Sequence, residues 1–389
     1  MRTTGIYEQT TAGGEAVNAF VPHSLPVNDP PIELTDPLRQ RLHAAEESLR
    51  RLSLAVEMVP STDWFLYAFV RKEAVVSSQI EGTQATLVDL LQFETDDTQE
   101  TSADVEEVCN YVEALRYARQ QLAAPKGLPL SVRLLNETHK RLMHGSRGAN
   151  KSPGQIRRTQ NWIGGSRPGN TAFVPPPPQR VEALLASLEK YLHGKDSLPP
   201  VIRAGLIHVQ FETIHPYLDG NGRIGRLLIA LLLEYWQLLP QPLLYLSLFF
   251  KRHQAEYYRR LSAVRTDGDW EGWLDFYLDG VAKIGDEAVS AARDLFAIVT
   301  NDRRRILEES AASVAALRLF EELPSHPIVT VNSVIRLLDT TKPTAGKAID
   351  VLVAAQVLKE MTGRQRSRSF GYHRYLDTLR IGTELSQQS

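Results

Sequence analysis

The sequence predicts a mainly α-helical protein with more than one domain. Apolar residues recur at intervals of three and four along much of the chain, whereas the alternation typical of strands is scarce. The length of 389 residues exceeds that of a usual single domain. Hydrophobic residues make up 43% and charged residues 23%, as in ordinary globular proteins, and the formal net charge is −2. The overall charge therefore indicates no nucleic acid or membrane surface as a partner.

Several classes of protein are excluded or disfavoured by composition. Cys109 is the single cysteine, so no intramolecular disulfide and no Cys/His zinc cluster can form. The most apolar stretch, 227–240, contains Glu234 and Gln237 and is shorter than the ~20 residues that a membrane span needs. The N-terminus lacks the apolar core of a signal peptide. We therefore expect a cytoplasmic protein that does not associate with a membrane.

The first hundred residues are expected to be an arm followed by helices. Residues 1–30 are rich in Thr, Gly and Pro without a period, which predicts a loose N-terminal arm. Residues 31–100 form an N-terminal helical region, whose first helix begins at Thr35-Asp36-Pro37 because proline suits a first helical turn. Further helices are expected at 62–78, 103–122, 129–145, 180–193, 199–213, 221–237 and 252–265, with another starting near Thr86.

The second half of the chain predicts a core, a linker and a separate domain. The helical pattern from Trp270 to about residue 308 is too long for one helix of a compact domain, so we expect a break there. We divide the chain into a core at 101–285, a linker helix at 286–322 and a C-terminal domain at 323–389.

The C-terminal domain has the element order of a winged helix-turn-helix. Helices are predicted at 330–338 and 343–355, followed by a short strand pair within 357–375. Residues 343–355 would be the recognition helix and residues 359–373 a basic wing that contacts phosphates. DNA binding and a role in dimerisation or target docking are both open, because many such folds bind no DNA.

The loop at 215–226 reads His-Pro-Tyr-Leu-Asp-Gly-Asn-Gly-Arg-Ile-Gly-Arg, directly before an apolar helix. A glycine-rich turn that opens a helix presents several free backbone N–H groups to an anion. Arg223 and Arg226 can add charge-assisted contacts to phosphate oxygens. The loop lacks the lysine of the usual P-loop, so a different kind of phosphate site is expected.

Two further side chains of this loop suggest its chemistry. Asp219 offers the oxygen ligand that magnesium prefers beside substrate phosphates. His215 can accept a proton near neutral pH. A base, a metal carboxylate and an anion cradle within one loop predict phosphoryl or nucleotidyl transfer.

The loop resembles the signature of the Fic family, His-x-Phe-x-Asp/Glu-Gly-Asn-Gly-Arg-x-x-Arg, and departs from it only at Tyr217. The resemblance extends over roughly residues 30–280. It implies a Fic-type helical core with a small β-hairpin flap. It also implies a protein adenylyltransferase that uses ATP with Mg²⁺ or Mn²⁺. Such an enzyme transfers AMP to a hydroxyl side chain of a target protein and to itself.

The resemblance also implies residue roles. His215 would deprotonate the target hydroxyl, Asp219 would hold the metal ion, and Arg226 would hold the γ-phosphate. The nucleotide-binding residues of the loop would be Gly220, Asn221, Gly222, Arg223, Ile224, Gly225 and Arg226.

Residues 77–82 read Ser-Ser-Gln-Ile-Glu-Gly, and taken alone they fit a helix end with Gly82 at the C′ position. Beside the loop, they resemble the family's inhibitory motif, Ser/Thr-x-x-x-Glu-Gly/Asn. The resemblance implies that Ser77, Glu81 and Gly82 form this motif. Glu81 would pair with Arg226 and keep it from the γ-phosphate of ATP.

The segment 154–178 could form an exposed β-hairpin. It resembles the family's flap, to which a target segment is added as a strand. Ile163, Gly164 and Gly165 are expected near the nucleotide. Tyr257 is expected to line the adenine pocket, although for each of these positions a packing role is an equally good interpretation.

His208 and Glu212 share one face of the helix before the loop, and we expect a structural role for them because the sequence places no third metal ligand. Other functions remain open. The protein could remove AMP, with Glu81 positioning a water molecule, or transfer UMP. It could also be a DNA-binding regulator whose Fic core senses a nucleotide. Family members often dimerise, so a homodimer is expected.

Overall fold

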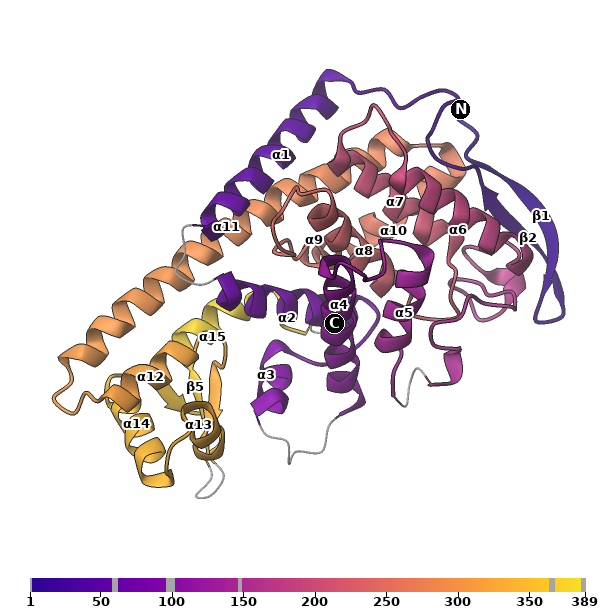
Figure 1. Cartoon of the computed structure of the whole chain (residues 1–389). Coiled ribbons are helices and arrows are strands. Elements are labelled where there is room, and N and C mark those ends of the chain that lie inside the picture. The colour runs from indigo at the N-terminus through magenta and orange to yellow at the C-terminus, as the bar shows by residue number, and fades with distance from the viewer. Residues whose placement is uncertain (1, 58–61, 96–101, 146–148, 364–367, 386–389) are drawn as a thin grey trace.

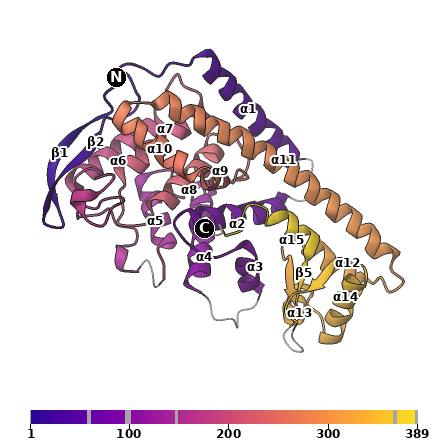
Figure 2. The same cartoon turned by 180° about the vertical axis from the view of Figure 1, so that it is seen from behind.

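The computed structural model describes residues 2–57, 62–95, 102–145, 149–363 and 368–385. Its described part is mainly α-helical, with one two-stranded sheet, β1-β2, and one three-stranded sheet of order β3-β5-β4 (Figure 1). The predicted fold class is therefore confirmed. The two sheets lie at opposite ends of the molecule, with the helical core between them (Figures 1 and 2).

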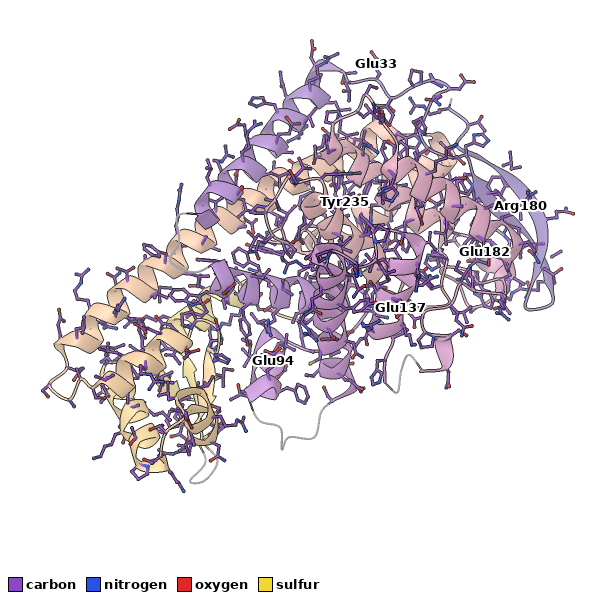
Figure 3. The ribbon with its side chains drawn as sticks, in the orientation of Figure 1. Glu33, Glu94, Glu137, Arg180, Glu182 and Tyr235 are labelled. Carbon is purple, nitrogen blue, oxygen red and sulfur yellow. The ribbon has the colours of Figure 1, made fainter. Side chains whose placement is uncertain are left out.

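The N-terminal segment differs from the prediction of a loose arm, which is wrong for most of residues 5–22. Strands β1 (Gly5–Ala12) and β2 (Glu15–Pro22) pair antiparallel. The turn between them is Gly13-Gly14, and both glycines have positive φ, which suits the two-residue turns of tight hairpins. Arg180, which lies beside the hairpin (Figure 3), forms an ion pair with Glu8 of β1 at 2.7 Å and ties the hairpin to the core.

The longest helix, α11 (Trp270–Glu308), runs without the expected break. The proposed boundary between core and linker at residue 285 therefore falls inside a helix. Helix α1 (Asp36–Glu57) lies along α11 (Figures 1 and 2). Arg41 contacts Asp279 at 2.8 Å, and the Ser48 hydroxyl donates to the carbonyl oxygen of Ala282 at 2.9 Å. Helix α1 thus packs along the N-terminal part of α11 as far as Asp286, which spans the expected boundary.

The middle of the molecule is built around one fully buried helix. Every residue of α7 (Pro200–Ile214) after its first is buried, and α8 (Asn221–Tyr235) packs beside it. The remaining core helices are α2 (Thr62–Ile80), α3 (Leu87–Thr95), α4 (Ala103–Ala123), α5 (Val132–Leu142), α6 (Pro178–His193), α9 (Ser247–Arg252) and α10 (Gln254–Asp267). The sequence did not predict α9, because one short helix has too few turns to show a period.

The C-terminal unit contains the two helices and the strand pair that were expected. Its elements are α12 (Val314–Glu322), β3 (Ile328–Thr330), α13 (Val331–Leu338), α14 (Lys342–Ala354), β4 (Leu358–Glu360), β5 (Ser369–Tyr372) and α15 (His373–Leu379). Strand β3 was not predicted. Arg364 and Arg366 of the expected wing lie outside the described residues. Among the described helices, none is long and apolar enough to cross a membrane.

Candidate active site

The loop at 215–226 joins α7 to α8, and its backbone is sharply turned at both ends. His215 follows α7 with a φ of 50°, and Gly220 precedes α8 with a φ of 77°. Gly222 lies in the first turn of α8, where a Cβ would stand 2.3 Å from an oxygen of Glu81. Glycine at this position therefore lets a carboxylate from another helix approach the N-terminus of α8.

Asn221 keeps this loop closed from within. Its side-chain nitrogen donates to the carbonyl oxygen of Tyr217 at 2.9 Å, and its side-chain oxygen accepts from the Tyr217 backbone N–H at 2.8 Å. The expected phosphate contact must therefore come from the Asn221 backbone. Ile224 offers no donor to an anion, because its side chain is buried in the core and its backbone N–H donates to the carbonyl oxygen of Gly220 at 3.0 Å. Of these two expected positions, only Asn221 could serve an anion, through its main-chain N–H group.

Tyr217, the one departure from the family signature, is well accommodated. Its ring stacks on His139 with 3.8 Å between centroids, and its hydroxyl donates to the side-chain oxygen of Asn136 at 2.9 Å. The His139 Nε2 lies 3.0 Å from the carbonyl oxygen of Asp219. Burial lowers the pKa of His139 to about 4, so the ring is uncharged at neutral pH. The sequence did not indicate His139 as part of the site.

Arg157 supports His215 and was also not predicted. Its side chain is buried, with Nε donating to the carbonyl oxygen of His215 at 2.9 Å and Nη2 donating to that of Pro176. Its backbone N–H donates to the carbonyl oxygen of Pro216 at 2.9 Å. Arg157 therefore joins the base of the segment 154–178 to the start of the loop.

His215 has the properties of a proton acceptor. Burial, followed by the nearby Arg157 charge, lowers the pKa of His215 to about 4. The imidazole is therefore neutral at physiological pH and can take a proton from a bound hydroxyl.

Arg226 is held by the segment that resembles the inhibitory motif. Its Nη2 lies 2.6 Å from Oε1 of Glu81, its Nε donates to the Ser77 hydroxyl at 2.9 Å, and Nη2 also donates to the Ser77 carbonyl oxygen at 2.9 Å. Burial opposes the charge of Arg226, but Glu81, together with Tyr257 and Glu212, raises the pKa of Arg226 above its ordinary value. The Arg226 side chain is 2% exposed and that of Glu81 is 34% exposed, so the carboxylate lies on the outer side of the pair.

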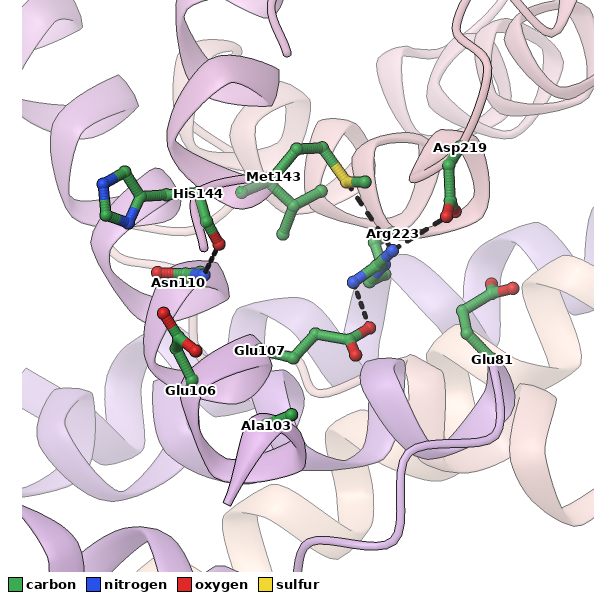
Figure 4. A pocket seen from close by; sticks show the side chains of 10 residues that line it. Glu81, Ala103, Glu106, Glu107, Asn110, Met143, His144, Asp219 and Arg223 are labelled. Carbon is green, nitrogen blue, oxygen red and sulfur yellow. Dashed lines mark hydrogen bonds and ion pairs between the residues drawn. The ribbon is translucent and has the colours of Figure 1, made fainter. Parts of the chain in front are cut away.

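Arg223 is held by acidic side chains as well. It forms an ion pair with Glu107 of α4, and its Nη2 lies 3.4 Å from Asp219 (Figure 4). Arg223, Glu81 and Asp219 line a cavity of about 230 Å³. Glu107 was not predicted, because its role depends on how α4 packs against α8.

The carboxylate of Asp219 lies where it could act as the expected magnesium ligand. Its side chain is 46% exposed and faces this cavity (Figure 4). Among the described residues there is no group of three or more His, Cys, Asp or Glu that could hold a metal ion. Magnesium usually takes one or two protein carboxylates and fills its remaining positions with phosphate oxygens and water. Asp219 would therefore bind magnesium together with a phosphate substrate.

The segment 154–178 forms a minimal hairpin. Ile163 and Phe173 form an isolated bridge, with N–H to carbonyl oxygen distances of 2.8 and 3.1 Å. Gly164 and Gly165 have φ values near +70°, as a turn requires. Asn161 at the base of the hairpin donates to the carbonyl oxygen of Tyr217, which places the hairpin beside the loop.

The two tyrosines of α10 have different surroundings. Tyr257 is 1% exposed, and its hydroxyl lies 2.8 Å from Nε2 of His208 in the core. It therefore presents no side-chain surface to a nucleotide in this structure, contrary to expectation. Tyr258, the next residue, is 47% exposed. Tyr258 is the better candidate for a ligand contact.

His208 and Glu212 do not form a metal pair. The His208 Nδ1 lies 3.0 Å from the carbonyl oxygen of Gly225, which supports the expected structural role. Glu212 is buried, and its Oε1 makes no hydrogen bond to any described residue. Burial raises the pKa of Glu212 to about 7. This carboxylate lies beside Gly225, where a Cβ would come within 2.1 Å of it.

The chain is similar in sequence to known proteins over about half of its length. The chain is similar to the protein adenylyltransferase Fic of Drosophila grimshawi, with 30% identity over 187 residues that cover 47% of this chain and 34% of the fly protein. The Drosophila willistoni protein of the same name is 29% identical over 187 residues, which cover 47% of this chain and 33% of that protein. This chain spans about a third of the length of the curated relatives it matches.

A solved structure extends the likeness of the fold. A crystal structure of a Fic family protein from Desulfovibrio desulfuricans G20 aligns with 88% of this chain and 97% of its own, at a TM-score of 0.56 and 20% identity. Residues 39–120 match the family model described as Fic/DOC family N-terminal, and residues 129–233 match the model described as Fic/DOC family. The chain therefore carries the two domains of the Fic/DOC family, the N-terminal one on α1 to α4 and the Fic domain on α5 to α8.

Proposed function

We propose that the protein is a nucleotidyltransferase that moves AMP from ATP to a hydroxyl side chain of a target protein and to itself. One observation supports this most strongly. The loop at 215–226 combines a neutral histidine, an exposed carboxylate and the N-terminus of α8 beside two arginines. These are the groups that transfer of a nucleotide between oxygens requires.

The proposed chemistry uses each group once. Neutral His215 accepts the proton of the target hydroxyl, whose oxygen attacks the α-phosphorus of ATP. A new phosphorus–oxygen bond forms to the target, and the bond to the bridging oxygen breaks, so pyrophosphate leaves. The N–H groups at the start of α8 and the arginines stabilise the negative phosphate oxygens. A magnesium ion held by Asp219 would neutralise phosphate charge.

Glu81 is proposed to inhibit this reaction. Nη2 of Arg226 already donates to the Glu81 carboxylate at 2.6 Å, and Nε of Arg226 donates to the Ser77 hydroxyl. A γ-phosphate that needs Arg226 must therefore displace a paired carboxylate, and ATP binds in a pose unsuited to transfer.

The experiment is incubation with α-labelled ATP or UTP and magnesium, comparing wild type, Glu81→Gly and His215→Ala. We expect strong labelling of Glu81→Gly and none once His215→Ala is added. Labelling that survives His215→Ala would refute the proposed mechanism. Preference for UTP would replace AMP by UMP as the transferred group.

Removal of AMP remains an alternative at the same site. Glu81 lines the cavity and is partly exposed, so it could position a water molecule for attack. Protein that the Glu81→Gly variant has labelled is the test substrate. Release of AMP by wild type, but not by Glu81→Gly, would favour this activity.

The C-terminal unit is proposed to be a winged helix-turn-helix. Helices α13 and α14 are joined by a short turn, and the exposed side of α14 carries Lys342 and Lys347. Retardation of duplex DNA by the whole protein, lost in Lys342→Ala/Lys347→Ala and weakened by salt, would support DNA binding. Docking of the target on the segment 154–178 and formation of a homodimer also remain predictions.

A further inference from the structure

The last turn of α2, which carries Ser77 and is directly followed by Glu81, contacts a segment from the far end of the chain. The side-chain nitrogen of Gln79 donates to the carbonyl oxygen of Thr383 at 2.9 Å. The same nitrogen donates to the carbonyl oxygen of Ala85 at 2.9 Å. One amide therefore connects the turn with the loop that follows it and with the C-terminal tail, which we define as residues 380–385.

Lys251 of α9 completes this connection. Its Nζ donates to the side-chain oxygen of Gln79 at 2.7 Å and to the carbonyl oxygen of Glu384 at 2.7 Å. The lysine thus bridges the same glutamine and the same tail. The side-chain nitrogen of Gln79 thus contacts the tail directly, and its side-chain oxygen contacts the tail through Lys251.

The tail has a defined path over α9. Thr383 is 1% exposed, and its N–H and hydroxyl both donate to the carbonyl oxygen of Arg380 at 2.8 Å. Gly382 has a φ of 84°, and a Cβ there would lie 2.7 Å from Leu248. Thr383 is the buried residue of this turn, and the positive φ of Gly382 would strain any other residue there, so the turn is fitted to its place on α9.

The tail continues directly from α15, so it is attached to the C-terminal unit. Arg374 of α15 contacts buried Asp302 of α11 at 2.9 Å. The hydroxyl of Thr95, the last residue of α3, donates to the carbonyl oxygen of Ile328 at 2.9 Å. These two contacts seat the C-terminal unit on the core. A displacement of α15 would also displace residues 380–385 and remove acceptors from Gln79 and Lys251 together.

We propose that the tail is a latch that keeps the last turn of α2 where Glu81 can pair with Arg226. The C-terminal unit operates this latch, and whatever displaces that unit from α11 releases the turn. This inference rests on the proposed function, since it describes how the inhibited state is maintained. The inhibited state would then depend on the tail as well as on Glu81, and the tail lies outside both segments that match the Fic/DOC family models.

The first test measures the turn itself and needs no activity. Amide hydrogen exchange at Glu81, Gly82 and Thr83 is compared between a variant ending at Arg380 and a matched control ending at Leu385. Loss of the tail contacts should speed this exchange roughly tenfold, whereas the control should match wild type. Lys251→Met is a second variant that keeps the whole chain. Unchanged exchange in both variants would overturn the latch.

The second test asks whether the latch acts through Glu81. Labelling from α-labelled ATP is measured for the variant ending at Arg380, for Glu81→Gly and for their combination. We expect the shortened variant to label about tenfold more than the control, and the combination to label no more than Glu81→Gly alone.

The outcomes separate the two proposals. If Glu81→Gly labels but the shortened variant matches the control, the latch is wrong and the proposed function stands. Extra labelling in the combination would show that the tail acts elsewhere, which also contradicts the latch. If Glu81→Gly transfers no nucleotide, the proposed function fails, and the exchange experiment alone decides on the latch.

Discussion

Glu81 and Arg226 stand 145 positions apart in the sequence, and their side chains meet at 2.6 Å across the entrance to the site. The guanidinium is buried, and the carboxylate is partly open to the cavity. Because Gly222 has no side chain, this contact forms directly over the N-terminus of α8. The group expected to bind a phosphate is thus occupied by an internal anion.

Glu81→Gly should raise self-labelling by roughly tenfold to a hundredfold, because a charge-assisted hydrogen bond no longer competes with the γ-phosphate. Glu81→Gln should give a smaller increase, since the amide can still accept from Arg226 but carries no charge. The measurement is incorporation from α-labelled ATP at equal protein concentration. Equal labelling by wild type and both variants would contradict the inhibitory role.

The pH dependence of transfer should reflect the depressed pKa of His215. The imidazole must be neutral to accept a proton. Its pKa is lowered from the ordinary 6.5 to about 4, so it stays neutral at pH values well below 6.5. In the Glu81→Gly background, kcat/KM should therefore stay level from pH 8 down to about pH 5 and fall below it. A fall in kcat/KM centred near pH 6.5 would contradict a lowered pKa of His215.

Arg157→Met should weaken both the fold and the reaction. It leaves carbonyl oxygens of His215 and Pro176 without their donor, at a cost of about 2–4 kcal/mol in the free energy of unfolding. Because His215 is then no longer held in position, the rate of nucleotide transfer should fall about a hundredfold. Denaturant unfolding and labelling in the Glu81→Gly background measure the two effects. The neighbouring, exposed Arg158→Met is the matched control and should change neither.

Glu212→Gln should change how stability depends on pH. The pKa of Glu212 is raised to about 7 in the folded protein from an ordinary 4.5, so the folded state binds more protons between these values. Its contribution to stability is therefore present below about pH 4.5 and lost as pH rises through 7. Relative to wild type, Glu212→Gln should gain up to about 3 kcal/mol between pH 5 and pH 8. Glu182→Gln, at an exposed position, is the control. If the free energy of unfolding changed with pH in the same way in both variants, the prediction would be contradicted.

Much of the architecture could be predicted because helices leave a period in the sequence. The expected helices at 103–122, 199–213 and 221–237 are present with small shifts at their ends. The hairpin at 5–22 was not predicted, because the Thr, Gly and Pro content of residues 1–30 was interpreted as a loose arm, whereas Gly13-Gly14 is the turn of a hairpin. Helix α9 was not predicted because of its length.

The site was predictable where its residues are neighbours in sequence. The segments 215–226 and 77–82 identify themselves by residue type and order. The supports of the loop, Arg157, His139 and Glu107, could not be found in this way. Each acts through contacts to residues far away in the sequence, and a single residue carries no periodic or motif signal.

The sequence by itself determined the helical class of the protein and the chemical groups of the loop, since period and residue order are local properties. Tertiary structure decided how those groups are held. It desolvated the half-buried His215 and so lowered its pKa, paired Arg226 with Glu81, turned Tyr257 into the core and brought Thr383 to Gln79. Desolvation and contacts between distant residues arise only when the helices pack, so no local pattern can encode them.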